Sequence, residues 1–192
     1  MKNIKPNKLL VVDLEACCWE EKLPSGEVVK EPPTGERNDI IEIGYALIDL
    51  EKRKIIKNDE ILINPRSEVS EFCTALTTLT KEQLSSDGER FERAIKKLYK
   101  MGFQNIPWGG WGAYDYSALK RECEFYGSKF PLSEEYINIS LMYRMWRGTL
   151  KKFSQKKALS QLNIEMEGTH HRGKWDAFNA AKIYLRMLSE KN

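Results

Sequence analysis

The sequence predicts an α/β fold: a mixed sheet of five strands, the first three antiparallel, flanked by helices on both faces. Two observations predict it. Three strand-like segments, at 8–14, 40–49 and 55–63, precede any long helical pattern. Beyond residue 88, segments with helical spacing of apolar residues alternate with short strand-like segments. In this order the first strand is expected to be central in the sheet.

The first half of the chain supplies the antiparallel strands. Four consecutive apolar residues, Leu9 to Val12, are typical of a strand that is buried on both faces. Residues 17–39 are polar and rich in proline and glycine, which predicts a long loop, or a small excursion or lid near a site. Alternating apolar residues at 40–49 predict the second strand, and a turn at 51–54 leads into the third as a hairpin.

The second half of the chain supplies the helices. Two short helical turns are expected between residues 70 and 84, where Thr80 and Gln83 have the spacing of a capping box. Short strands are expected at 105–111 and, at an edge of the sheet, at 136–139. The apolar spacing predicts longer helices at 88–101, 115–126, 154–162 and 175–188.

Length and composition indicate a soluble globular chain. At 192 residues, with 41% hydrophobic and 31% charged residues, a single domain over 1–192 with a core at about 8–188 is expected. No apolar run approaches the ~20 residues of a membrane span. The N-terminus lacks a signal-peptide pattern, so we expect a cytoplasmic location and no membrane partner. The four cysteines form no C-x-x-C pair and are expected to be reduced thiols.

Acidic residues stand at the ends of several predicted elements. Asp13 and Glu15 close the first strand, where residues two apart point to the same side. Asp115 lies where a strand gives way to a helix, and Asp176 follows His171 by five positions just before the last helix. Clustered carboxylates raise one another's pKa, and Mg²⁺ or Mn²⁺ relieves this conflict because these ions prefer oxygen ligands. The pattern favours metal-assisted phosphodiester hydrolysis with a histidine as general base.

Basic residues gather in one part of the chain. The net charge is only +3, but no acidic residue occurs from Tyr136 to Ile164. That span contains Arg144, Arg147, Lys151, Lys152, Lys156 and Lys157. As a group these residues favour a polyanionic substrate, whereas any single lysine is equally consistent with a solvated helix face. Aromatic residues between them offer stacking surfaces for bases, although each is individually more typical of a core.

Four segments of the chain match a known pattern. They are Val12 to Trp19 with its Asp-Leu-Glu-Ala-Cys, Phe72 to Thr80, Gly112 to Asp115, and His171 with Asp176. A strand with Ile-Ile-Glu-Ile-Gly at 40–44 follows the first of them. Together they resemble the DEDDh 3′–5′ exonucleases of the DnaQ-like group, in the ribonuclease H-like superfamily. Within that group, the resemblance is to the histone-mRNA and small-interfering-RNA 3′ exonucleases and their bacterial relatives.

Two departures from the subfamily pattern are modest. Cys17 stands where the subfamily often has threonine, and Trp175 stands where relatives often have an aspartate. Neither changes the five core positions. The resemblance therefore covers about residues 8 to 188, nearly the whole chain.

The resemblance implies a ribonuclease H-like fold and a 3′–5′ exoribonuclease that releases nucleoside 5′-monophosphates. Two divalent cations, Mg²⁺ or Mn²⁺, would be held by Asp13, Glu15, Asp115 and Asp176. His171 would be the general base, and His170 is its rival. The family spacing of four intervening residues before the last aspartate favours His171.

Substrate contacts are implied at several positions. The backbone around Glu15 and Ala16 would meet the terminal 3′-hydroxyl, and Leu76 and Thr77 would lie near the last base. From the basic span we predict that Lys151 and Lys152 contact the RNA backbone.

Several alternatives remain open at this point. RNA is favoured over DNA, but a DNA exonuclease of proofreading or repair is a rival. A regulatory binding protein of exonuclease ancestry is another, although the intact catalytic set speaks against it. Asp115 is also consistent with a helix N-cap. Glu42 is expected on an exposed polar face, or else in support of the site, and Trp108 and Trp111 are expected in the core.

Overall fold

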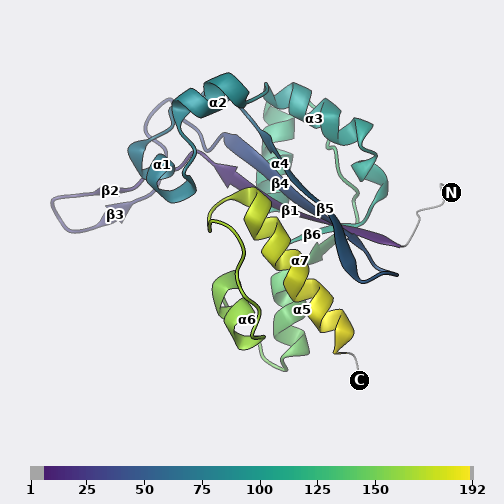
Figure 1. Ribbon diagram of the computed structural model, residues 1–192. Helices are drawn as coiled ribbons and strands as arrows, with labels where there is room; N and C mark the ends of the chain where they lie inside the picture. The colour runs from purple at the N-terminus through teal and green to yellow at the C-terminus, as the bar shows by residue number, and fades with distance from the viewer. Residues whose placement is uncertain (1–6, 191–192) are drawn as a thin grey trace.

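The structure is a computed structural model that describes residues 7–190. A five-stranded sheet in the order β5-β4-β1-β6-β7 forms its centre (Figure 1). Antiparallel pairing joins β1 to β4 and β4 to β5, whereas β6 runs parallel to β1 and β7 runs parallel to β6. The strands are β1 (Lys8–Ala16), β4 (Ile40–Asp49), β5 (Lys54–Leu62), β6 (Trp108–Gly110) and β7 (Tyr136–Asn138). The predicted mixed sheet with a central first strand is confirmed.

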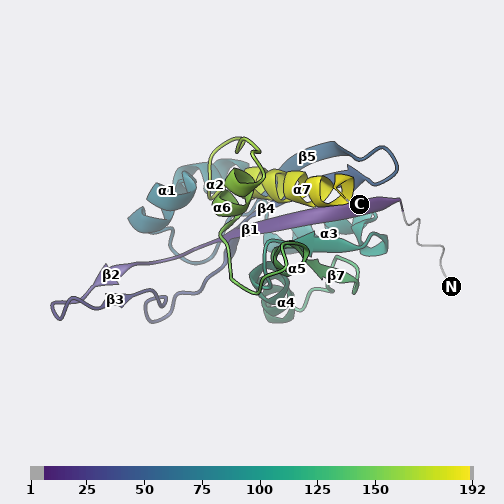
Figure 2. The ribbon, with the colours of Figure 1, turned by 90° about the horizontal axis from the view of Figure 1, so that it is seen from below.

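Helices cover both faces of the sheet, as predicted. They are α1 (Glu71–Thr77), α2 (Lys81–Asp87), α3 (Phe91–Lys100), α4 (Tyr114–Phe125), α5 (Ile139–Trp146), α6 (Gln155–Gln161) and α7 (Gly173–Ser189), with a 3₁₀ turn η1 (Phe103–Asn105). Figure 2 shows α7 and α4 on opposite sides of β1. No helix within residues 7–190 is long and apolar enough to cross a membrane.

Alternation along β1 builds a core on each side of the sheet. Leu10, Val12 and Leu14 pack toward α3 and α4. Leu9 and Val11 pack with apolar residues of α5, α6 and α7. Because side chains alternate along a strand, Asp13 and Glu15 continue the second set, on the face that α7 covers. The apolar run in the sequence therefore reflects a strand that is buried on both sides.

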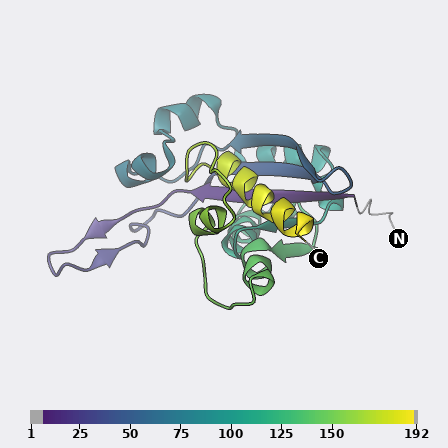
Figure 3. The same ribbon diagram turned by 60° about the horizontal axis from the view of Figure 1, so that its bottom comes forward.

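The segment between β1 and β4 is the expected excursion. Two short strands, β2 (Glu21–Lys22) and β3 (Val28–Val29), pair in an antiparallel hairpin. Figure 3 shows this hairpin projecting from the body of the molecule beyond α1. The hairpin extends away from the sheet and does not fold back over it as a lid would.

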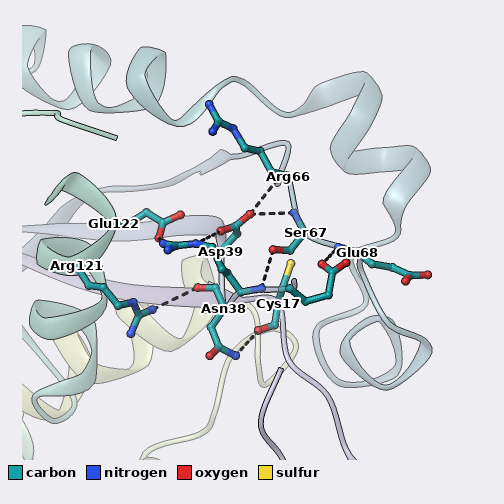
Figure 4. Close-up of polar contacts among 10 residues, drawn as sticks. Cys17, Asn38, Asp39, Arg66, Ser67, Glu68, Arg121 and Glu122 are labelled. Atoms are coloured by element: carbon teal, nitrogen blue, oxygen red, sulfur yellow. Dashed lines mark hydrogen bonds and ion pairs between the residues drawn. The ribbon is translucent and has the colours of Figure 1, made fainter. Parts of the chain in front are cut away.

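A buried aspartate fixes the return of this excursion to the body (Figure 4). Asp39, 2% exposed, accepts backbone hydrogen bonds from Arg66 at 3.0 Å and Ser67 at 2.9 Å. Arg37 pairs with Asp39 at 3.3 Å and with Glu122 of α4 at 3.1 Å. The carboxylate of Asp39 is thus paired and hydrogen-bonded, as a buried charge must be. This network joins the start of β4 to α4, the helix that carries Asp115.

One helix differs from the sequence prediction. The edge strand ends at Asn138, and α5 begins at Ile139, where no helix was predicted. The Asn138 side chain caps α5 by accepting a hydrogen bond from the backbone N–H of Leu141 at 2.9 Å. Only Ile139 and Tyr143 of α5 are buried, and such a short apolar stripe does not stand out in the sequence.

The four cysteines are free thiols, in agreement with the expectation of reduced cysteines. Cys17, Cys73 and Cys123 are buried, and Cys18 is half-buried. Thr80 caps α2 by accepting a hydrogen bond from the backbone N–H of Gln83, which matches half of the predicted capping box.

Candidate active site

Three carboxylates meet where β1 ends beside the N-terminus of α7. Asp13, Glu15 and Asp176 each present an oxygen, and these atoms lie within 4.8 Å of one another. They border an open pocket of about 320 Å³. Its lining also includes Trp111, Tyr114, Asp115, Ser154, Gln155, His170 and His171. The structure therefore brings together all five core residues that the sequence predicted.

Asp115 reaches this cluster from the first turn of α4. Its Oδ1 accepts a hydrogen bond of 3.0 Å from the backbone N–H of Leu14, and the residue is only 6% exposed. The N-cap alternative is wrong, because Ala113 occupies the N-cap position and makes no side-chain cap. A Cβ at Gly110 would lie 2.7 Å from Asp115 Oδ2, so glycine at the end of β6 leaves room for this carboxylate.

Asp176 lies in the first turn of α7, which packs directly against β4. A Cβ on Gly44 would stand 1.8 Å from the carbonyl carbon of Gly173, so only glycine permits this approach. Asp176 is 5% exposed, and its Oδ2 accepts the backbone N–H of His171 at 2.9 Å. The Gln155 side-chain amide donates to the Asp176 carbonyl at 2.9 Å. These contacts hold the start of α7 over the end of β1.

Both histidines lie in the pocket. The His170 Nδ1 atom is 3.1 Å and 3.2 Å from the two carboxylate oxygens of Asp176. The two imidazole rings stack with centroids 4.0 Å apart, and His171 adopts a left-handed backbone with φ of 61°. Burial and the neighbouring His170 lower the pKa of His171, against the opposing effect of Asp176. A neutral imidazole at His171 suits proton acceptance, and the choice of His171 over His170 stays a prediction.

Asp13, Glu15 and Asp115 have raised pKa values. Burial, with repulsion from Asp115, Glu15 and Asp176, raises the pKa of Asp13 well above its usual range. Burial and the charges of Asp176, Glu42 and Asp115 raise the pKa of Glu15 to about 9. Burial raises the pKa of Asp115 to about 6, although its backbone hydrogen bonds act in the opposite direction. The free site therefore holds protons that a cation would displace.

The donor set fits divalent cations. Among residues 7–190, no lysine or arginine forms an ion pair with Asp13, Glu15 or Asp115. The group of Asp13, Glu15 and Asp176 offers carboxylate oxygens, which hard cations such as Mg²⁺ and Mn²⁺ prefer. His170 and His171 form a second possible group with Asp176, whose ligand atoms also lie within 4.8 Å of one another. Asp13, Glu15 and Asp115 thus supply the charge and the donor atoms of a metal site, and within the described residues only Asp176 of the four carboxylates has a basic neighbour, His170.

The predicted substrate residues lie in different places. Glu15 lines the pocket, and Ala16 and Leu76 are half-buried. Thr77 is fully buried, and its hydroxyl donates to the Cys73 carbonyl at 2.8 Å and accepts from Leu79 N–H at 3.2 Å. Its side chain is therefore not on the surface.

Lys151 and Lys152 are exposed in the linker that enters α6 beside the pocket. Neither lysine lines the pocket itself. The predicted substrate contacts of Ala16, Leu76, Thr77 and both lysines stay predictions.

Several residues around the site differ from the sequence expectations. Trp108 is fully buried as predicted, whereas Trp111 is half-buried and lines the pocket. Glu42 was expected on an exposed polar face, yet it is 0% exposed beneath α7. The signal for Glu42 was an acidic residue inside an otherwise apolar strand. The role of Gln155 had no local signal, because its partner Asp176 is distant in the sequence.

Comparisons with known proteins agree with this geometry. The family model described as Exonuclease (RNase_T) matches residues 10–184. The "Probable 3'-5' exonuclease KapD" of Bacillus subtilis is 28% identical over 189 residues, covering 96% of this chain and 86% of that protein. Human "3'-5' exoribonuclease 1" is 26% identical over 200 residues, and the match spans 95% of this chain but about half, 52%, of the human protein.

A solved structure shows the same fold. The nuclease domain of 3'hExo, a DEDDh family member bound to rAMP, superposes with a TM-score of 0.80 at 24% identity. The match covers 97% of this chain and 94% of that one. The chain combines the acidic cluster with a ribonuclease H-like fold, and the family model matches most of its length. It therefore belongs to the exonuclease family, among relatives described as 3′–5′ exonucleases.

Proposed function

We propose that this exonuclease shortens RNA from its 3′ end and releases nucleoside 5′-monophosphates, using two divalent cations and a histidine base. The observation that carries the proposal is the convergence of Asp13, Glu15 and Asp176 within 4.8 Å, with Asp115 beside them. Bound Mg²⁺ or Mn²⁺ would supply Lewis acidity at the scissile phosphate and its leaving oxygen.

The residues of the chain have separate roles in this proposal. Asp13, Glu15, Asp115 and Asp176 would hold the cations. The His171 imidazole accepts the proton of the attacking water, for which its lowered pKa keeps it neutral. The water oxygen bonds to the phosphorus of the terminal nucleotide as the bond from phosphorus to the preceding 3′ oxygen breaks. The leaving 3′ oxygen takes a proton from solvent, so the shortened strand ends again in a 3′-hydroxyl, and His171 returns its proton to solvent.

Two observations support RNA as the substrate. Several relatives are described as exoribonucleases, including the human protein. A solved structure described as "3'-end specific recognition of histone mRNA stem-loop by 3'-exonuclease" has a TM-score of 0.81 with this chain at 24% identity. In this chain, the exposed Lys151 and Lys152 precede Ser154 and Gln155 at the pocket edge, where they would meet the RNA backbone.

A digestion of end-labelled strands tests the proposal. RNA and DNA of the same sequence, each with a free or a blocked 3′ end, are incubated with Mg²⁺, with Mn²⁺ or with excess chelator. We expect metal-dependent release of 5′-mononucleotides from free 3′ ends, faster for RNA. Faster digestion of DNA would identify the DNA exonuclease alternative. Tight binding without digestion would identify the regulatory alternative, and undiminished activity in chelator would exclude the metal mechanism.

A further inference from the structure

Glu42 is a buried carboxylate directly beside the candidate site. In the antiparallel pairing of β1 and β4 it stands opposite Glu15, on the face that α7 covers. It is 0% exposed, and both of its oxygens are engaged. Its Oε2 accepts from Arg172 Nε at 2.9 Å, and its Oε1 accepts from the backbone N–H of Lys174 at 2.8 Å. The carboxylate is therefore occupied by protein donors and is not a free ligand.

These two contacts hold the start of α7. The helix begins at Gly173, and its N-cap residue Arg172 makes no side-chain cap. The first N–H groups of a helix need partners from outside it. Glu42 supplies one from the neighbouring strand, and a negative charge is favourable at a helix N-terminus. Arg172 balances the charge of Glu42 and also pairs with Glu60 at 3.2 Å.

The packing around this contact leaves little freedom. A Cβ on Gly173 would lie 2.8 Å from the Asp13 carbonyl oxygen and 3.4 Å from Cδ of Glu42. The backbone of α7 thus rests on the strand ends that bear the carboxylates. His171 precedes Arg172, and Asp176 follows Lys174 by two residues, so the anchored residues lie between the histidine and the aspartate.

We propose that Glu42 is a positioning residue: by holding Arg172 and the Lys174 N–H, it sets His171 and Asp176 against Asp13 and Glu15. It touches neither substrate nor reacting atoms in this role. The expected effect of Glu42 on the rate of RNA digestion rests on the proposed function, whereas its expected effect on Mn²⁺ affinity does not. Protein groups that orient metal ligands typically change metal affinity or activity about 10–100-fold when they are lost. Glu42 would act at one remove, through the α7 backbone that carries Asp176.

The test compares Glu42→Gln with Glu60→Gln. Glutamine keeps one acceptor oxygen but presents an amide donor to either Arg172 or the Lys174 N–H, so one contact is lost. Glu60→Gln removes a carboxylate that pairs with the same arginine, but Glu60 is more exposed, and in the part of the chain that the structure describes it accepts no backbone N–H of α7. We expect kcat for RNA to fall about 10–100-fold in Glu42→Gln at an unchanged KM, and Mn²⁺ affinity to fall by a similar factor. Glu60→Gln should keep values near those of the wild type.

Glu42→Asp is a second variant that preserves the buried charge. The shorter side chain can still attract the flexible Arg172 but withdraws from the fixed Lys174 N–H, so it should show the same direction of change. Mn²⁺ binding is measured by calorimetry, folding by circular dichroism and thermal unfolding. A folded variant with lowered Tm but unchanged kcat and Mn²⁺ affinity would reduce Glu42 to a purely structural role and overturn the proposal.

Two further outcomes are informative. Loss of folding in both Glu42 variants would also overturn the proposal, since Glu42 would then be required for the fold itself. An inactive wild-type protein would contradict the proposed function, whereas the Mn²⁺ affinities of the folded variants would still decide whether Glu42 positions Asp176.

Discussion

The Asp115 carboxylate accepts a hydrogen bond of 3.0 Å from the backbone N–H of Leu14, the residue between Asp13 and Glu15. This bond fixes α4 to the end of β1 without any basic side chain. It keeps the Asp115 carboxylate close to Asp13 and Glu15, although α4 and α7 cover opposite sides of β1. The cost of this arrangement is a cluster of negative charges that is relieved only by protons or cations.

The charge cluster predicts opposite effects of one substitution on activity and stability. Asp13→Asn should lose activity by orders of magnitude because a cation ligand is removed. In chelator its Tm should exceed that of the wild type, because asparagine needs neither to take up a proton nor to carry a charge in the buried site, as Asp13 must; roughly 2–4 °C is expected per kcal/mol relieved. Rates on labelled RNA and thermal unfolding measure the two effects. Glu124→Gln, an exposed charge removal on α4, is the control and should change neither. A lower Tm for Asp13→Asn in chelator would contradict the argument that Asp13 destabilises the metal-free fold.

The raised carboxyl pKa values predict how metal stabilisation depends on pH. The pKa of Glu15 is about 9 in the folded protein and near 4.5 for a free glutamate, so between these values the folded state binds more protons than the unfolded state. Stability of the metal-free protein should therefore fall as pH rises from about 5 to 9. Mn²⁺ replaces those protons, so its effect on Tm should grow over the same range. Thermal unfolding at several pH values, with Mn²⁺ and with chelator, measures this effect. If the difference in Tm between the two samples became smaller as pH rises, the prediction would be refuted.

The two adjacent histidines should differ in their effect on catalysis. His171→Ala should lower turnover ~10²–10⁴-fold while RNA and Mn²⁺ still bind, because it removes a general base. His170→Ala should lose little, although His170 contacts the Asp176 carboxylate. Single-turnover digestion and Mn²⁺ calorimetry separate the steps. The reverse ranking of the two variants would assign the base to His170.

The exposed lysines before α6 should contribute to RNA affinity through phosphate contacts. In a double variant, Lys151→Gln with Lys152→Gln, binding should weaken for all sequences. The slope of log affinity against log salt should flatten by roughly one unit per lost contact. Lys96→Gln with Lys100→Gln, both exposed on α3 across the sheet, is the matched control. Equal salt slopes for the two double variants and the wild type would show that the segment is only a solvated surface.

The close contact between β4 and α7 predicts that Gly44 does not tolerate a side chain. In Gly44→Ala the new Cβ would fall 1.8 Å from the Gly173 carbonyl carbon, so α7 must move. A loss of about 1–3 kcal/mol in unfolding free energy, or more, is expected from overpacking. Activity should fall further than stability alone explains, since Asp176 moves with α7. Gly102→Ala, at an open position with φ of 78°, tests the cost of backbone strain without a clash. A Gly44→Ala protein with the unfolding free energy and the activity of the wild type would contradict the packing argument.

Local patterns were sufficient for much of this molecule. The apolar run of β1 and the period-two alternation of β4 predicted the central strands, because burial on a strand is read directly from residue order. The same alternation put Asp13 and Glu15 on one face. Helical spacing predicted α3, α4, α6 and α7, but the short buried stripe of α5 was missed.

Other features depended on long-range contacts. The sequence by itself determined which residues are acidic and where they stand on their own elements. Only the tertiary structure decided that Glu42 is buried and paired with Arg172, that Gln155 holds the Asp176 backbone, and that His170 approaches Asp176. The physical reason is that a buried charge takes its partner from whatever packs against it. Arg172, the partner of Glu42, lies 130 residues away along the chain, and local sequence periodicity carries no information about contacts at such a separation.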